Sequence, residues 1–124
     1  MKCLFCEDKN IIIENNLAYI RMVDEGYNVS KGHALAIPHR HVENFFDITK
    51  EEREAMFSLI DAFKKVSDEK YSPDGYNIGA NCGKVAGQTV MHAHMHIIPR
   101  YIGDVKEASK SGIEKTILSL KENK

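Results

Sequence analysis

The sequence predicts an α+β domain in which a mostly antiparallel sheet packs against one long helix. Three observations support this fold class. Short segments rich in β-branched and aromatic residues follow one another as neighbours, a single long amphipathic stretch divides them, and neither an internal repeat nor a linker interrupts the chain. Because 124 residues are too few for two ordinary domains, we expect residues 1–124 to form one domain.

The first half of the chain is expected to supply three strands. Residues 11–13 and 17–23 have the composition of strands and are separated by a short polar turn. A polar loop over residues 24–32 leads to a short buried strand at residues 33–37. Proline cannot donate to a sheet ladder, so we expect Pro38 to end that strand.

The clearest helix is expected over residues 49–71. Thr49 and Glu52 have the spacing of a capping box, in which each side chain satisfies a backbone N–H of the first turn. Apolar residues then recur at steps of three and four, which places them on one face expected to pack on the sheet: Met56, Leu59, Ile60, Phe63 and Val66.

The second half of the chain is expected to begin with a strand at residues 76–80 and a glycine-rich loop at residues 81–89. A further strand is expected at residues 92–98 and should stop at Pro99. Residues 111–121 carry a helical pattern of apolar residues, so a shorter C-terminal helix is expected there.

The composition excludes several classes of partner. Seventeen basic residues balance eighteen acidic ones, which does not suit a nucleic-acid or membrane-surface binder. No apolar run is long enough to cross a bilayer, and acidic residues at positions 7 and 8 interrupt any signal-peptide core. We therefore expect a soluble cytoplasmic protein with no nucleic-acid partner.

Three cysteines do not make a disulfide framework in such a protein. Cys3 and Cys6 form a C-x-x-C pair, which is commonly half of a zinc site and less often a redox couple. No βαβ pattern surrounds the pair, which disfavours the redox reading. Cys82 stands apart and is interpreted as a small packing residue.

The six histidines fall into two short clusters, and the second cluster is the sharpest signal in the chain. His92, His94 and His96 alternate with apolar residues, so in a strand their rings would line one side about 6.5–7 Å apart. Such a row suits two chemistries. One is a three-histidine metal site that activates water, and the other is nucleophilic catalysis by an imidazole.

The loop before this row favours phosphate chemistry. Gly83 and Gly87 allow backbone N–H groups to approach an anion, and Gln88 and Thr89 add neutral donors. The loop does not have the Walker A pattern, because Lys84 is followed by neither Ser nor Thr.

Two segments resemble the histidine triad family. Residues 87–98, GQTVMHAHMHII, resemble the family's signature, and residues 32–38, GHALAIP, resemble its second recurrent segment. The likeness covers residues 3–104 and leaves residues 105–124 as a C-terminal tail. It implies a histidine-triad (HIT)-like α+β fold, normally a homodimer, that binds purine nucleotides and hydrolyses or transfers nucleotidyl groups without an organic cofactor.

The resemblance also assigns roles to individual residues. His94 matches the nucleophile that attacks the α-phosphorus to form a nucleotidyl-histidine intermediate, and His96 matches a donor to the phosphate oxygens. Further positions match residues that line the nucleotide site: His33, Asn81, Gln88 and Thr89.

A subset of the family binds a structural zinc ion through an N-terminal C-x-x-C pair and two histidines. Cys3, Cys6, His41 and His92 match that set. A Cys₂His₂ set is closed and tetrahedral, so it would engage His92 and leave His94 available for chemistry. The alternative is a C-x-x-C pair without metal.

The chain departs from the family pattern at the ribose contact. The family's Asp or Asn falls on Glu25, with Asp24 beside it, so either carboxylate is a candidate. Four apolar residues are candidates for the base pocket or for the core: Leu4, Phe5, Tyr19 and Ile20.

These features predict a nucleotide hydrolase. Residues 99–105 resemble branches that include diadenosine polyphosphate hydrolases, so dinucleoside polyphosphates are the first expected substrates and nucleoside phosphoramidates the second. The alternatives are a nucleotide-binding or adaptor protein with little activity, and a metal-dependent hydrolase that uses all three histidines of the row.

Overall fold

The computed structural model describes residues 3–7 and 10–104 and contains one five-stranded sheet. All four strand pairs are antiparallel, and the strand order across the sheet is β1-β2-β3-β5-β4. The strands are β1 (Ile11–Glu14), β2 (Ala18–Met22), β3 (Ala34–Pro38), β4 (Gly75–Gly79) and β5 (Met95–Arg100). The α+β class and the antiparallel sheet predicted from the sequence are both confirmed.

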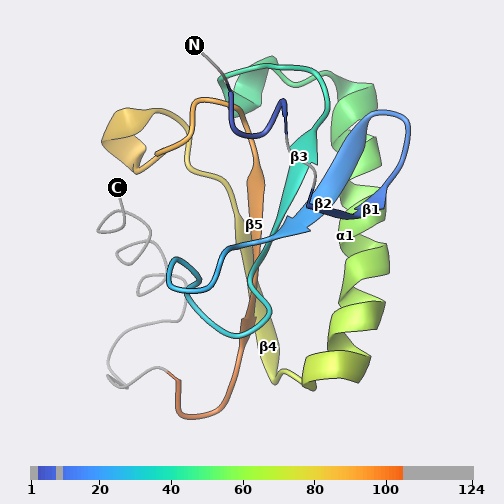
Figure 1. Ribbon diagram of the computed structural model, residues 1–124, viewed down its shortest axis with the longest axis vertical. Coiled ribbons are helices and arrows are strands. Elements are labelled where there is room, and N and C mark those ends of the chain that lie inside the picture. Colours follow the sequence, from blue (N-terminus) through green and yellow to red (C-terminus); the bar gives the residue numbers. More distant parts are fainter. Residues whose placement is uncertain (1–2, 8–9, 105–124) are drawn as a thin grey trace.

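Helix α1 (Lys50–Tyr71) lies along one face of the sheet (Figure 1). Thr49 is its N-cap, and the capping box with Glu52 forms as predicted: Thr49 Oγ1 accepts from the Glu52 N–H at 3.1 Å, and Glu52 Oε1 accepts from the Thr49 N–H at 2.9 Å. The buried face of α1 includes Met56, Leu59, Ile60 and Phe63.

The predicted apolar stripe was wrong at its last position. Val66 is 49% exposed, and Ser67 is buried in its place. Ser67 follows Met56, Ile60 and Phe63 at steps of four and three, which keeps it on the buried line, whereas Val66 turns toward solvent.

The opposite face of the sheet is covered by the N-terminal segment. Phe5 packs there against Tyr19, Leu35 and Ile37, which point away from α1. In Figure 1 this segment lies near the end of β3 and near the chain that enters β5. The sheet therefore has one face that packs on a helix and one on which side chains can meet a ligand.

β3 ends at Pro38 as predicted, whereas β5 continues past Pro99 and ends at Arg100. Both prolines belong to strand pairs. Pro38 pairs with Ala18, and Pro99 pairs with Tyr76. The ladder between β3 and β5 reaches only from Ala34 to Ala36 on β3, so both prolines lie where their strand has a partner on one side only. A missing N–H is tolerated at such a position.

The last strand begins later than predicted. β5 starts at Met95, so His92, in a bend, and His94 precede the strand. The Ala93 N–H donates to the Val42 carbonyl at 2.7 Å, which holds this stretch against the chain after β3 rather than in the sheet ladder.

The remaining connections are short. There are two single-turn 3₁₀ helices among the described residues. η1 (Phe45–Asp47) precedes α1, and η2 (Lys84–Ala86) lies within the glycine-rich loop. Within the described residues no helix combines the length and the apolar character that a bilayer crossing demands. The helix predicted at residues 111–121 lies outside the described residues.

Candidate functional site

The predicted row of three rings divides into two sites. His94 and His96 remain neighbours, with ring centroids 5.1 Å apart, whereas the His92 ring lies against Cys3, Cys6 and His41. The division follows from the late start of β5, because His92 precedes the regular strand and is not held to its alternation.

Hydrogen bonds fix the proton of His94 on one nitrogen. His94 Nδ1 lies 2.8 Å from the carbonyl oxygen of His92. A carbonyl can only accept, so a neutral His94 carries its proton on Nδ1 and leaves a lone pair on Nε2. Burial lowers the pKa of His94, which favours this neutral form. His94 therefore has the tautomer that a nucleophilic imidazole needs, with the proton on Nδ1 and the lone pair on Nε2.

A second chain of hydrogen bonds fixes His96. The backbone N–H of Val29 donates to His33 Nδ1 at 3.0 Å, so neutral His33 carries its proton on Nε2. His33 Nε2 lies 2.9 Å from His96 Nδ1, which must then accept. His96 is left with an N–H at Nε2, the opposite tautomer to that of His94.

Both partners in this chain are held neutral. Burial, with the neighbouring His94 second, lowers the pKa of His33 to about 4. Burial also lowers the pKa of His96 to about 3, with His94 and His33 as the next causes. At neutral pH these rings therefore act as oriented hydrogen-bond donors rather than as cations.

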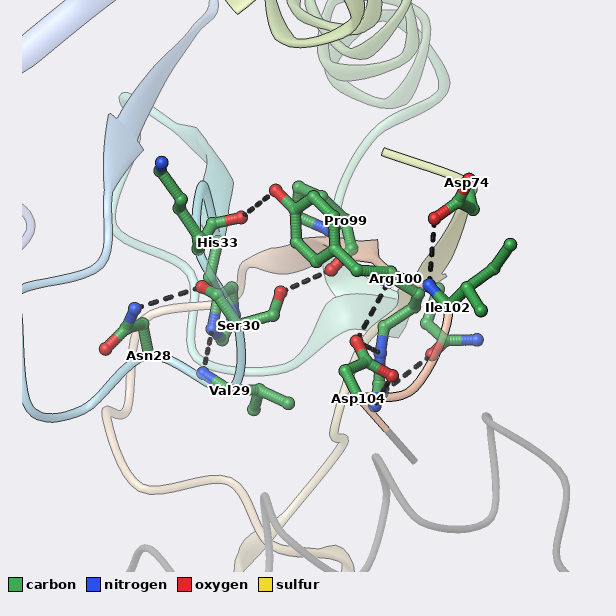
Figure 2. A network of polar contacts seen from close by, with 12 residues as sticks. Asn28, Val29, Ser30, His33, Asp74, Pro99, Arg100, Ile102 and Asp104 are labelled. Carbon is green, nitrogen blue, oxygen red and sulfur yellow. Dashed lines mark hydrogen bonds and ion pairs between the residues drawn. The ribbon is translucent and has the colours of Figure 1, made fainter. Parts of the chain in front are cut away.

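The loop that carries Val29 is fastened to the end of β5, as Figure 2 shows. Ser30 Oγ donates to the carbonyl of Pro99, and Tyr101 Oη donates to the carbonyl of Lys31 at 2.6 Å. Gly32 lets the loop pass close to α1 with φ of 88°, because a Cβ there would lie 2.9 Å from the Tyr71 ring. These contacts hold the Val29 N–H against His33.

A cavity of about 420 Å³ opens on the sheet face opposite α1 and contains these histidines. Its lining includes most of the predicted nucleotide-site residues, namely His33, Asn81, Thr89, His94, His96 and Asp24. Of the two carboxylates considered for the ribose contact, Asp24 lines the cavity and Glu25 is outside its lining.

Gln88 is placed differently from the other predicted residues. Its side chain is buried beneath the glycine-rich loop and is outside the cavity lining. Nε2 donates to the carbonyls of Glu43 and Val90 at 2.8 and 3.0 Å, and Oε1 accepts from the Gly83 N–H at 2.8 Å. In this structure Gln88 shapes the loop from below, and Thr89 and Asn81 line the cavity.

The candidates for the base pocket also separate. Leu4 and Phe5 line the cavity, whereas Ile20 belongs to the core under α1. Tyr19 is buried and donates its hydroxyl to the Phe5 carbonyl at 2.7 Å, so it supports the N-terminal segment.

Sequence reasoning did not identify Arg21, Val23, Tyr27 and Leu35, which also line the cavity. Arg21 lies on β2 and Val23 directly follows the strand, so a signal was present in the period of two that puts both on the face opposite the core. Arg21 is 4% exposed, which is unusual for a charged residue.

The second site is a group of four metal-ligating side chains. Cys3, Cys6, His41 and His92 place one ligand atom each within 4.8 Å of one another. The Sγ–Nδ1 distances are 3.3 Å for Cys3–His92, 3.3 Å for Cys6–His41 and 3.6 Å for Cys6–His92. Tetrahedral zinc with ordinary bond lengths separates a sulfur and a nitrogen ligand by about 3.6 Å.

The tautomer of His92 suits a metal as well. His92 Nε2 lies 2.8 Å from the carbonyl oxygen of Pro38, so its proton is on Nε2 and the lone pair of Nδ1 faces the cysteines. A backbone carbonyl that orients a ligating histidine in this way is a usual outer partner of zinc sites. These four residues therefore fit a zinc ion.

The chain is similar to several proteins of known name. It is 34% identical over 107 residues to the Protein hit of Bacillus subtilis, covering 80% of this chain and 71% of that protein. It is 31% identical over 108 residues to an adenosine 5'-monophosphoramidase of Schizosaccharomyces pombe, covering 81% and 75%. A bis(5'-nucleosyl)-tetraphosphatase of the same yeast is 41% identical over 76 residues, covering 61% and 42%.

Solved structures agree with this likeness. A HIT family protein from Bacillus anthracis superposes with a TM-score of 0.75 at 29% identity, covering 98% of this chain and 96% of the other. A zinc-bound histidine triad family protein from Mycobacterium smegmatis superposes with a TM-score of 0.74 at 27% identity, covering 99% and 93%. The HIT domain model matches residues 6–103, and the chain therefore belongs to the HIT domain family.

Proposed function

We propose that this protein hydrolyses small nucleotide substrates at their α-phosphate through a nucleotidyl-histidine intermediate on His94. The observation that carries the proposal is the pair of opposite tautomers in one cavity, with a lone pair on His94 Nε2 beside an N–H on His96 Nε2. A neutral imidazole whose other nitrogen is held by a carbonyl has the arrangement that nucleophilic catalysis requires.

The reaction has two displacements at phosphorus. His94 Nε2 attacks the α-phosphorus, an N–P bond forms, and the bond from phosphorus to the leaving group breaks. Water then attacks the same phosphorus, a P–O bond forms as the water releases a proton to solvent, the N–P bond breaks, and the nucleoside monophosphate leaves while His94 regains its lone pair. The leaving group departs with the bonding electrons and takes its proton from solvent if its pKa requires one.

The surrounding donors stabilise the charge that moves during both displacements. The N–H of His96 and the hydroxyl of Thr89 face the same cavity as His94 and are suited to the non-bridging phosphate oxygens. Because His33 and His96 are neutral at pH 7, they donate without the electrostatic cost of adding buried positive charges.

Asp24 is the residue we assign to the ribose. It lines the cavity, and its side chain is 70% exposed even though it accepts from Arg21. A carboxylate with accessible oxygens can accept from ribose hydroxyls, and Glu25 lies outside the cavity lining.

The relatives support two substrate classes. The proteins with which the chain shares 31% and 41% identity are named for phosphoramidate and dinucleoside tetraphosphate cleavage. We propose dinucleoside polyphosphates as the first class and AMP-linked phosphoramidates as the second. Both present an α-phosphorus with a leaving group, so one nucleophile serves either.

The proposal is tested with a panel of both substrate classes against wild type and His94→Ala. We expect turnover to fall by several orders of magnitude while nucleotide binding is retained, because only the nucleophile is removed. His39→Ala is the matched control, since His39 is a half-exposed histidine outside the cavity lining. Equal turnover in wild type and His94→Ala would remove His94 from this role.

Two other functions make different predictions for the same experiment. A binding or adaptor protein would bind nucleotides with negligible turnover in wild type. A hydrolase that uses the whole histidine row around one metal would lose activity on chelation and regain it with metal. The turn of His92 toward the cysteines favours the nucleophile over that metal site.

We further propose that Cys3, Cys6, His41 and His92 hold a structural zinc ion. A closed set of four protein ligands supplies folding free energy and leaves no position for substrate. Protein purified without chelators is expected to contain one zinc per chain and to melt at a lower temperature after metal removal. Cys6→Ser should lower both the zinc content and the melting temperature, and a chain that lacks zinc yet melts unchanged would contradict the proposal.

A homodimer is the assembly we propose. β4 lies at an edge of the sheet, and Ile78 on this strand is 50% exposed. Val66 on α1 is 49% exposed. An apolar edge strand is usually covered in a native protein. Sedimentation equilibrium should give twice the chain mass, and a monomer at micromolar concentration would contradict the assembly.

A further inference from the structure

We propose that Arg21 makes the cavity select 6-oxopurines, such as guanine and hypoxanthine, over adenine. This inference rests on the proposed function, because it concerns the base of the nucleotide whose α-phosphate reaches His94. Nothing in the motifs that the sequence shares with its family addresses this position.

The sheet register sets Arg21 at the correct place for a base. Arg21 pairs with Leu35 on β3, and Leu35 pairs with His96 on β5. Directly paired residues point to the same face, and each strand step is about 4.8 Å, so Arg21 and His96 are roughly 10 Å apart on the cavity side. A nucleoside monophosphate with its phosphate at His96 would pass over Leu35 and bring its base to Arg21.

The guanidinium is held in position before any ligand arrives. Arg21 Nε donates to the Met22 carbonyl at 3.1 Å, and Nη2 donates to Asp24 Oδ1 at 3.0 Å. Its central carbon lies 5.9 Å from the centre of the Phe5 ring. With only 4% of the residue exposed, the side chain has little freedom left to lose when a base binds.

The surroundings of Arg21 make the hydrogen bonds of a base decisive. Leu4, Phe5, Val23 and Leu35 line the same cavity as Arg21 and offer apolar faces for stacking. Apolar faces accept any base, so discrimination falls to the polar group among them.

The chemistry of a guanidinium specifies which edge fits. It offers five N–H donors in a planar fork and no acceptor. Guanine and hypoxanthine present two neighbouring acceptors, O6 and N7, and Arg is the usual bidentate partner of that edge. Adenine presents N7 beside the N6 amino donor, which would oppose the donors of Arg21.

The test is the affinity of the full-length protein for GMP, IMP and AMP, measured by isothermal titration calorimetry. We expect GMP and IMP to bind about 10-fold more tightly than AMP, the lower end of the usual discrimination by a bidentate pair. 7-deaza-GMP should lose part of this advantage, because a C–H replaces N7. These ligand comparisons need no variant.

Variants then assign the preference to Arg21. Arg21→Met keeps the length of the side chain without the donors and should bring the GMP:AMP affinity ratio close to one. Arg21→Lys keeps the charge without the fork and should lose most of the preference. Arg53→Met is the matched control, because Arg53 stacks on Phe45 beside α1, outside the cavity lining, and should keep the wild-type ratio.

The outcomes separate this inference from the proposed function. Equal binding of GMP and AMP by wild type, or a ratio unchanged in folded Arg21→Met, overturns the role of Arg21 while the proposed hydrolase stands. Failure of all three mononucleotides to bind overturns the proposed function and this inference with it.

Discussion

At the level of single residues, the site depends on which nitrogen of each histidine carries the proton. Four hydrogen bonds set these positions. Their partners are the backbone N–H of Val29, the ring of His33, and the carbonyls of Pro38 and His92. The Val29 N–H lies furthest from the chemistry, yet it decides that His96 presents a donor. Sequence alone cannot reveal such a contact, because Val29 has no polar side chain.

These tautomers can be measured by nitrogen-15 NMR of labelled protein at pH 7. We expect His94 to be protonated at Nδ1, and His33 and His96 to be protonated at Nε2. His39 lies outside this chain of contacts, and its Nε2 is 3.2 Å from the Asn15 carbonyl oxygen, so it should also be protonated at Nε2 and provides a reference signal. A His94 ring protonated at Nε2 would contradict the nucleophile assignment.

Acid should destabilise the protein through His33. Its pKa is lowered to about 4 from an ordinary value near 6.5, so the unfolded chain binds the proton more readily. The stability from a neutral His33 is complete above about pH 6.5 and is lost as the pH falls toward 4. Urea unfolding between pH 7 and 4 should show this loss.

His33→Asn is the variant that isolates the effect, because its amide oxygen can still accept from Val29 without titrating. Its free energy of unfolding should depend less on pH across this window than that of wild type. Identical pH dependence in the two proteins would show that His33 titrates normally.

Several residue roles were readable from sequence, and others were not. The pairing of His94 with His96 follows from their alternation in the sequence, whereas the set of Cys3, Cys6, His41 and His92 was predicted from the resemblance to the zinc-binding subset of the family. The position of Gln88 beneath the loop depends on carbonyls of Glu43 and Val90, which side-chain patterns do not encode.

At the level of elements, α1 shows how far local signals reach. Its start was predicted to the residue, because the Thr49–Glu52 capping box is a local exchange of hydrogen bonds. The apolar residues of its buried face were predicted except at the last position. There the prediction chose Val66 because it is apolar, but Val66 faces solvent and Ser67 is buried. The end of β3 at Pro38 was predicted correctly, but Pro99 does not end β5, because the tolerance of a proline depends on how far the neighbouring strand extends.

Thr49→Ala should lower the free energy of unfolding by about 1 kcal/mol, the usual cost of losing an N-cap. The Oγ1 that accepts from the Glu52 N–H disappears, and the matching bond from the Thr49 N–H loses its geometry. Chemical denaturation measures the difference, and Thr49→Ser is the control, because it keeps the hydroxyl. Equal losses in both variants would assign the effect to packing of the methyl group.

At the level of the whole molecule, the metal site and the cavity share one short segment. Cys3 and Cys6 are metal-ligand candidates, and the two residues between them, Leu4 and Phe5, line the cavity. His92 adds a second connection, because its carbonyl holds His94 Nδ1. Neither connection could be predicted from the two motifs taken separately, since it arises from the packing of the N-terminus across the sheet.

Removal of the metal should therefore weaken nucleotide binding. Without a metal to hold the cysteines, Leu4 and Phe5 are restrained by packing and by the hydrogen bond from Tyr19 to the Phe5 carbonyl. We therefore expect GMP affinity to fall about 10-fold, within the usual range of coupling between sites. Titration of metal-free and zinc-loaded protein measures the change. By thermodynamic reciprocity GMP should raise zinc affinity by the same factor, and equal GMP affinity in both forms would show that the sites are independent.

The position of Leu4 and Phe5 between two candidate metal ligands, Cys3 and Cys6, also has a consequence for how new specificities can arise. Leu4 is 61% exposed, lines the cavity, and belongs to a segment that the proposed zinc ion would hold through Cys3 and Cys6. A change of side chain at Leu4 can reshape the rim that meets a purine while the reactive imidazoles stay in place. Substitutions at Leu4, whether natural or engineered, can therefore change which ligand is preferred without moving the histidines.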